Sequence, residues 1–197
     1  MKRLTSKEML AASFRELAES RPIDKITTKD IAENCGYSQA TFYRQFKDKY
    51  DLIAWAYTRD LEAILDELTG EEVSLKQTLL SAANYFQAHR EYLSNLLQHT
   101  GGYDSFVKNM TEIHFASLRK VFLRLKGVEA LDAETEMYGR IYCLGTVLFS
   151  CEWILGKYPV SAEALAQVYE NALPGPLGRY FTQKRVNQCE FSHHAKT

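Results

Sequence analysis

Residues 38–46 combine polar, basic and apolar side chains in a pattern that suits a helix lying against DNA. Gln39 can pair with the edge of an adenine and Arg44 with the edge of a guanine, and small side chains can contact a thymine methyl group. Phe42 and Phe46 are spaced to anchor the other side of such a helix in an apolar core. The side chains expected to point toward DNA are Gln39, Ala40, Thr41, Tyr43 and Arg44.

Further polar residues nearby suit the phosphate backbone, which positions a protein on DNA but carries no sequence information. Tyr43 and Lys49 can offer a hydroxyl group and an ammonium group to phosphate oxygens. Helix starts near Thr28 and Lys49 would add backbone N–H donors for anions. The candidate DNA contacts outside the base-facing set are Thr28, Lys29, Ser38 and Lys49.

Each helix that must position these residues has its own start or stop signal. Thr27 and Asp30 have the spacing of a capping box, and Gly36 can supply the left-handed residue that ends a helix. Ser38 and Asp48 are suited to cap the two helices that follow. Two short helices joined by a glycine-containing turn predict a helix-turn-helix, whose second helix lies in a major groove. The two predicted helices span residues 28–34 and 39–46.

Two spaced patterns in this region are more specific than a helix-turn-helix alone. They are Thr-Thr-x-x-Ile-Ala-x-x-x-Gly at 27–36 and Ser-x-x-Thr-Phe-Tyr-x-x-Phe-x-x-Lys at 38–49, followed by Leu52. The chain resembles the TetR-like family of bacterial transcription regulators at these residues, and the match is close over residues 5–55. Looser matches to the branch that includes the activator of dihydroxyacetone kinase operons lie at residues 89–93, 104–106, 145–153 and 161–163.

This resemblance implies a homodimer that binds a palindromic operator in double-stranded DNA. It also implies a helical body in which a small-molecule effector tilts the fourth helix and changes the spacing of two DNA-binding heads. A repressor released by its effector is the expected function. An activator that works with a protein partner, and a helical adaptor that no longer binds DNA, stay open as alternatives. The base-facing positions vary within the family, so the operator sequence is not implied.

The rest of the chain also has the pattern of helices. It contains only four prolines and ten glycines, and no stretch alternates with the period of a strand. We predict an all-α fold of about nine helices, in which a three-helix head is joined by a long fourth helix to a larger helical body. The predicted divisions are a DNA-binding domain at 1–47, a ligand-binding and dimerisation domain at 48–182, and a polar, disordered tail at 183–197.

Aromatic and polar side chains on the predicted body helices could line a ligand pocket, since such pockets are mainly apolar with a few placed polar groups. For any one of these residues, ordinary core packing is the simpler explanation. The candidate pocket residues are Tyr85, Phe86, His89, Tyr92, Phe106, Met110, His114, Tyr138 and Tyr142.

The predicted helix over residues 135–157 is apolar on nearly every side, which is typical of a helix that is covered all round. In a chain of this size, a second subunit is the expected source of the extra cover. Gly145 would allow another helix to approach closely. The candidate dimer contacts are Gly145, Leu148, Phe149, Glu152 and Trp153.

Charge is unevenly distributed along the chain, whose net charge is −1. Residues 1–50 hold ten Lys and Arg against seven Asp and Glu, whereas the remainder holds fourteen against eighteen. A basic head on an acidic body suits a DNA-binding module attached to a body that does not bind DNA. The four cysteines form no CxxC motif and are expected to be reduced residues in a cytoplasmic protein.

No pattern points to catalysis, a metal ion, a cofactor or a membrane segment. GxSxG, HExxH and phosphate-binding glycine loops are absent from the sequence, and no His or Cys cluster has the spacing of metal ligands. The apolar stretch at 141–151 has eleven residues, which is too short to cross a bilayer. A small helical enzyme stays open as an alternative that measurable turnover would support.

Overall fold

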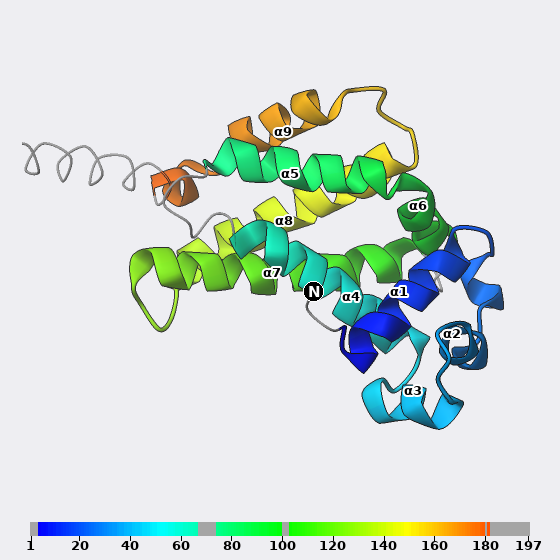
Figure 1. Cartoon of the computed structure of the whole chain (residues 1–197). Coiled ribbons are helices and arrows are strands. Elements are labelled where there is room, and N and C mark those ends of the chain that lie inside the picture. Colours follow the sequence, from blue (N-terminus) through cyan, green and yellow to red (C-terminus); the bar gives the residue numbers. More distant parts are fainter. Residues whose placement is uncertain (1–3, 67–73, 100–102, 180, 182–197) are drawn as a thin grey trace, which may run out of the picture.

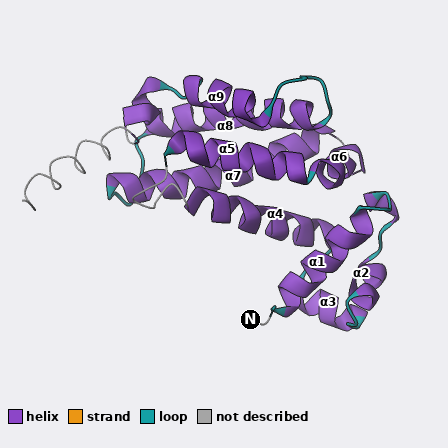
Figure 2. Cartoon of the chain, turned by 45° about the horizontal axis from the view of Figure 1, so that its top comes forward, coloured by secondary structure: helices purple, strands orange, loops and turns teal. Residues whose placement is uncertain are grey.

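The computed structural model describes residues 4–66, 74–99, 103–179 and 181, and the predicted tail at 183–197 lies outside them. The described residues form helices and connecting turns without a strand, which confirms the predicted all-α fold (Figure 2). The elements are α1 (Ser6–Ala18), the short 3-10 helix η1 (Ile23–Lys25), α2 (Thr28–Asn34), α3 (Gln39–Gln45), α4 (Lys49–Asp66), α5 (Leu75–Ala88), α6 (Arg90–His99), α7 (Tyr103–Lys126), α8 (Ala133–Ile154) and α9 (Ala162–Asn171).

Helices α1, α2 and α3 form a small head at one end of the molecule (Figure 1). The capping box of Thr27 and Asp30 is present at the start of α2, and Ser38 caps α3 by accepting a hydrogen bond from the Thr41 N–H. Gly36 has a φ of +75°, the left-handed conformation that a glycine adopts without strain. These local signals therefore define both helices before any distant contact is made.

Helix α4 leaves the head and runs along the body, where it packs on α5 and α7 (Figures 1 and 2). Within the body α7 packs beside α8, and α5 packs beside α9. Helix α4 contacts α1 in the head and both α5 and α7 in the body. One helix therefore belongs to both regions.

The apolar core is continuous from the head into the body. Leu10 and Phe14 of α1 are fully buried, and they share one cluster with Tyr92 and Leu96 of α6. Asn95 of α6 adds polar contacts, because its amide nitrogen donates to the carbonyl oxygens of Ala18 and Arg21, both at 2.8 Å. Its side-chain oxygen accepts the backbone N–H of residue 23 at 3.1 Å. The head is therefore docked on α6 as well as on α4.

Helix α8 ends at Ile154, three residues before the predicted end. Gly156 has a φ of +84°, and the Lys157 N–H donates to the Glu152 carbonyl at 3.0 Å. This six-to-one hydrogen bond with a left-handed glycine is a Schellman motif, which ends a helix. Gly156 therefore ends α8 before residue 157, where the helix was predicted to end.

Candidate nucleic-acid interface and body cavity

The turn between α2 and α3 sets the direction of α3. The Tyr37 N–H donates to the Ala32 carbonyl at 2.8 Å, which closes the turn. Behind α3, Phe42 is fully buried and Phe46 is 3% exposed, so both predicted anchors hold the helix on the head. The face of α3 that is left to solvent carries Gln39, Ala40, Tyr43 and Arg44.

A hydrogen-bonded cluster links the start of α2 to the exposed face of α3. The Tyr43 hydroxyl lies 3.2 Å from Thr28 Oγ1, and the Gln39 side-chain N–H donates to the same oxygen at 3.1 Å. Tyr43 is nevertheless 55% exposed. The structure thus brings three predicted DNA contacts together and orients them before DNA is bound.

A second small cluster occupies the start of α3. Ser38 Oγ lies 3.1 Å from Thr41 Oγ1, and the Arg44 guanidinium donates to Thr41 Oγ1 at 2.9 Å. The hydroxyl group of Thr41 is therefore engaged within the head. A guanidinium has five N–H donors, so this bond leaves others for a base edge or a phosphate.

Lys49 is engaged in hydrogen bonds within the chain. Its ammonium group donates to the carbonyl oxygens of Ile23 at 2.8 Å, Ile26 at 2.9 Å and Asp24 at 3.3 Å. Burial lowers the pKa of this ammonium group. An ammonium group has three donors, and these three carbonyl contacts can use all of them. The contacts tie α4 to the η1 turn. A phosphate contact of Lys49 stays a prediction that would require this arrangement to open.

Two other lysines remain at the surface of the head. Lys29 is exposed and lies 3.8 Å from Glu33 in an ion pair on α2. Lys47, which was not predicted as a contact, is exposed in the turn after α3. In the sequence, Lys47 stands three residues after Arg44, and this spacing could have indicated a second basic side chain near the proposed DNA-binding face.

The junction between head and body contains a buried polar contact. Arg15 of α1 and Tyr85 of α5 both donate to Asp60 Oδ2 of α4, each at 2.6 Å. Burial and the hydrogen bond to this carboxylate raise the pKa of Tyr85. The Tyr85 ring lies 4.6 Å from the ring of His89, and the Arg15 guanidinium lies 5.4 Å from the ring of Tyr92. Three predicted pocket residues therefore lie at this junction, and none of them lines either of the two body cavities described below.

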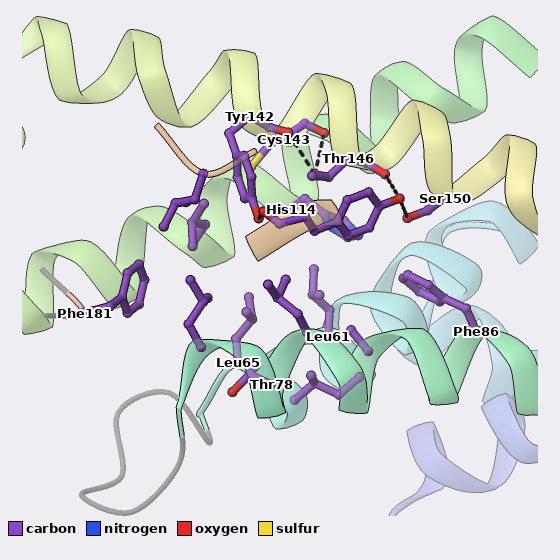
Figure 3. Close-up of a pocket in the computed structure, with 17 residues that line it drawn as sticks. Leu61, Leu65, Thr78, Phe86, His114, Tyr142, Cys143, Thr146, Ser150 and Phe181 are labelled. Atoms are coloured by element: carbon purple, nitrogen blue, oxygen red, sulfur yellow. Dashed lines mark hydrogen bonds between the residues drawn. The ribbon is translucent and has the colours of Figure 1, made fainter. Parts of the chain in front are cut away.

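The body encloses a cavity of about 80 Å³ between α4, α5, α7, α8 and α9 (Figure 3). Of the predicted pocket residues, Phe86, His114 and Tyr142 line it. A smaller cavity of about 20 Å³ is lined by Phe106 and Met110 as well as by Phe86 and His114. Tyr138 packs instead on the apolar cluster around Phe115 and Phe122. The remaining residues of the main cavity are Leu61, Ile64, Leu65, Leu75, Thr78, Leu79, Ala82, Leu118, Cys143, Thr146, Ser150, Tyr169, Leu173 and Phe181.

Some of these cavity residues had a sequence signal that was overlooked. Thr146 and Ser150 are four residues apart in the apolar helix α8, so they occupy one face of it. The Tyr169 hydroxyl donates to the Thr146 carbonyl at 2.9 Å and lies 2.8 Å from Ser150 Oγ. Contact with α9 could not be read from this spacing, because it depends on how two helices distant in sequence pack.

His114 connects the main cavity to α4. Its Nε2 lies 2.6 Å from the Tyr57 hydroxyl of α4, and the two rings lie 5.7 Å apart. Burial lowers the pKa of His114 to about 4 and raises the pKa of Tyr57. Both side chains are therefore neutral near pH 7, and they join the cavity wall to the helix that carries the head.

An apolar strip on α8 and α9 is left open to solvent. Ile141 is 65% exposed and Phe149 is 47% exposed on α8, and Val168 is 59% exposed on α9. These residues line a groove of about 440 Å³ together with Gly145. A Cβ atom built on Gly145 would meet no heavy atom within 4 Å. The predicted dimer contacts Gly145 and Phe149 therefore belong to this open strip.

The other predicted dimer contacts are engaged within the chain. Trp153 is 4% exposed, and its indole N–H donates to the Val160 carbonyl at 2.9 Å. Leu148 packs against the main apolar core. Glu152 accepts hydrogen bonds from Lys157 at 2.7 Å and from the Tyr158 hydroxyl at 3.0 Å. These three side chains support α8 from within, so a role in a dimer stays a prediction for them.

Membrane-spanning helices and metal-binding clusters are both absent from the described part of the chain. None of its helices combines the length and the apolar character required to cross a bilayer. Nowhere in those residues do three or more His, Cys, Asp or Glu side chains gather in a group that could hold a metal ion.

Comparison with known proteins provides independent findings on the head. Residues 10–55 match the family described as bacterial regulatory proteins, tetR family. YxbF of Bacillus subtilis (strain 168), an uncharacterized HTH-type transcriptional regulator, is 25% identical over 159 residues. That match covers 77% of this chain but only 40% of YxbF, so this chain corresponds to less than half of that relative.

The activator DhaS is similar in both sequence and structure. The HTH-type dhaKLM operon transcriptional activator DhaS of Lactococcus lactis subsp. lactis (strain IL1403) is 17% identical over 149 residues, which cover 68% of this chain and 79% of DhaS. A solved structure of a dihydroxyacetone kinase operon activator DhaS superposes with a TM-score of 0.63 at 18% identity, over 85% of this chain and 93% of that one.

Thermus thermophilus FadR, a TetR-family repressor solved with lauroyl-CoA, superposes with a TM-score of 0.56 at 15% identity. The superposition covers 85% of this chain and 92% of FadR. At these identities the structural matches show a shared all-α fold.

Proposed function

Since this chain carries the DNA-binding domain of the tetR family of bacterial regulatory proteins over residues 10–55, we propose that it binds a palindromic operator as a homodimer and releases it when a small molecule occupies the body. It would act in the cytoplasm, where bacterial DNA lies. The observation that carries this proposal is the exposed polar face of α3, backed by the buried Phe42 and Phe46.

The two kinds of contact on the head have separate roles in this proposal. Gln39 and Arg44 read base edges, because an amide and a guanidinium can each form paired hydrogen bonds with one base. Tyr43, Thr28 and Lys29 contact phosphates and hold the register of α3 in the groove. The Tyr43–Thr28–Gln39 cluster supports this assignment, since it fixes these side chains on one side of the head.

The exposed strip of α8 and α9 supports the homodimer. A monomer seldom leaves a continuous row of large apolar side chains in water, and such rows mark interfaces. An interface between two copies of this strip would present two heads, which fit one face of DNA when their reading helices are about 34–36 Å apart.

Regulation by a ligand would act through α4. This helix begins next to α3, and Leu61, Ile64 and Leu65 near its other end form one wall of the main cavity. A ligand that widens the cavity would push this wall and change the spacing of the heads. A coupling of about 1–3 kcal/mol is enough for a 5- to 150-fold change in operator affinity.

We propose that the protein acts as a repressor, and an activator is the second candidate. The likeness to DhaS favours the second, because both matches carry the word activator in their names. A reporter gene placed behind the operator distinguishes them: deletion of the regulator raises expression for a repressor and lowers it for an activator.

The first experiment is binding of the purified protein to DNA fragments from its own gene neighbourhood at two salt concentrations. We expect salt-sensitive binding to a fragment with a palindrome, because phosphate contacts release counterions. Tyr43→Ala should weaken binding to all sequences, whereas Gln39→Ala should relax specificity at one base pair. Failure to bind any fragment at low salt would favour an adaptor without DNA-binding activity.

The dimer is tested separately by Gly145→Leu. The open space around Gly145 means that the substitution leaves the isolated subunit intact and obstructs only a partner. We expect a shift from dimer to monomer in sedimentation, while the same side chain introduced at the exposed Ala88 should leave the mass unchanged. A dimer that survives Gly145→Leu would place the interface elsewhere.

A further inference from the structure

The part of the main cavity wall that the structure describes has no charged side chain. None of the described residues around the cavity is Asp, Glu, Lys or Arg. Charged residues of the neighbouring helices pair away from it, as Arg124 does with Asp66 and Arg119 with Glu136. His114 and Cys143 could ionise, but burial lowers the pKa of His114 and raises that of Cys143, each to a value far from 7. The wall is therefore neutral under physiological conditions.

The polar groups that α8 and α9 contribute to the wall are hydrogen-bonded to one another, whereas the Thr78 hydroxyl on α5 is buried without a hydrogen-bond partner. The Tyr142 hydroxyl donates to the Tyr169 carbonyl at 2.9 Å, and the Thr146 hydroxyl donates to the Tyr142 carbonyl at 2.9 Å. Ser150 and Tyr169 are joined at 2.8 Å, as Figure 3 shows with dashed lines. A ligand with an ionised group would find the Thr78 hydroxyl as a partner, but one neutral hydroxyl does not replace the hydration shell of an ion, and further partners would require these bonds to break. A ligand with little polar surface would need no such partners.

The size of the cavity limits what it can hold without rearrangement. A volume of about 80 Å³ corresponds to about five to eight water-sized groups, since one water needs roughly 10–15 Å³ on this measure. The smaller cavity of about 20 Å³ adjoins the main cavity at Phe86, His114 and Ser150. A compact ring or short chain matches this space better than a large extended molecule.

We propose that the effector cavity of this chain takes a compact, uncharged and mainly apolar molecule, and that it rejects molecules of the same shape that carry either charge. This inference rests on the proposed function only in treating the cavity as the effector site. An unpaired charge moved from water into an apolar site loses its hydration without compensation. Contacts with the leucine side chains of α4 and α5 favour apolar surface of any kind.

The test compares four probes with one shared ring: toluene, benzyl alcohol, benzoate and benzylammonium. Binding to the full chain at pH 7 is followed by calorimetry and by the rise in melting temperature, which increases with the concentration of a ligand that binds the folded state. We expect toluene and benzyl alcohol to bind, and both ions to bind at least about tenfold more weakly.

Two variants of α5 assign the binding to the cavity. Ala82 lines the cavity and Ala88 lies exposed on the same helix, so Ala82→Leu should block the neutral probes and Ala88→Leu should not. Thermal unfolding shows whether Ala82→Leu is folded; if it is not, Leu118→Phe serves as the blocking variant, since Leu118 enters the same cavity from α7.

Two results would overturn the proposal. One is binding of benzoate or benzylammonium at the affinity of benzyl alcohol with the same sensitivity to the blocking variant, and the other is the absence of binding by all four probes. Operator binding without any probe is measured in parallel. If it persists when the probe test fails, the DNA-binding function stands and only the ligand class is wrong.

Discussion

The two sites proposed on the head and in the body offer their ligands opposite chemical environments. On the head, polar side chains lie in solvent on two neighbouring helices, and the residues of the Thr28–Tyr43 contact are only 15 positions apart. In the body, the described wall of the cavity is mainly apolar and has no charged side chain, and it gathers residues from Leu61 to Phe181. DNA is highly charged and is met outside the fold, whereas a small apolar molecule must be taken out of water. The comparison shows how one chain keeps two incompatible chemical environments apart, with α4 as the shared element.

The two regions also differ in how they are stabilised. The head is built on short helices, and its fully buried side chains include Phe14, Ile31 and Phe42, so the loss of one leaves a cavity in a small region. The body has longer helices and a second cluster around Phe122. A defect in the head should therefore spread through the whole DNA-binding surface, while the body should tolerate a comparable loss with its helices intact.

Phe42→Ala should have the largest effect and would break the head while sparing the body. Removal of a fully buried phenylalanine costs about 3–5 kcal/mol of unfolding free energy. We expect loss of operator binding and a lower melting temperature by circular dichroism, with most helix signal retained below the transition. Tyr43→Ala is the control, because it should weaken DNA binding with little change in stability. Equal melting temperatures for Phe42→Ala and the parent chain would contradict this picture of the head.

A fall in pH should weaken the body through His114. The folded state holds this imidazole neutral down to a pKa of about 4, whereas the unfolded chain takes up the proton near 6.5. The unfolded state therefore binds more protons between these two pH values. The contribution of His114 to the free energy of unfolding is fully present above pH 6.5 and is lost as the pH falls toward 4, by about 3 kcal/mol in all.

The variant His114→Gln isolates this effect from the carboxyl groups that titrate in the same range. Glutamine can still hydrogen-bond to Tyr57 but has no group that gains a proton. Urea unfolding from pH 7 to pH 4.5 should show a shallower loss of stability for the variant than for the parent chain. Parallel curves would mean that His114 is more accessible to solvent than its burial indicates.

Lys49→Met should have the smallest of the three effects. It tests whether Lys49 only stabilises the head or also contacts a DNA phosphate. Methionine keeps the apolar stem of the side chain and removes three hydrogen bonds to the η1 turn. A loss of about 1–3 kcal/mol is expected for carbonyl groups left without their charged donor. If Lys49 acts only within the head, the salt dependence of operator binding is unchanged; a slope reduced by about one unit would identify it as a phosphate contact instead.

The sequence alone was sufficient for the features that depend on neighbours in the chain. Capping residues such as Thr27 and Ser38 act over three or four positions, so the positions of α2 and α3 followed directly from residue types. The same holds for the buried side of α3, because helical spacing places Phe42 and Phe46 together. The family resemblance rests on this same region.

Only the tertiary structure decided which body residues meet. Tyr85, His89 and Tyr92 had the right chemistry for a pocket, yet the packing of α1 against α4 and α6 drew them to the head–body junction. The cavity instead uses Ser150 and Tyr169, from helices whose crossing no local pattern specifies. Helix spacing tells which side chains share a face, but not which face of another helix lies opposite, since that depends on the packing of the whole core.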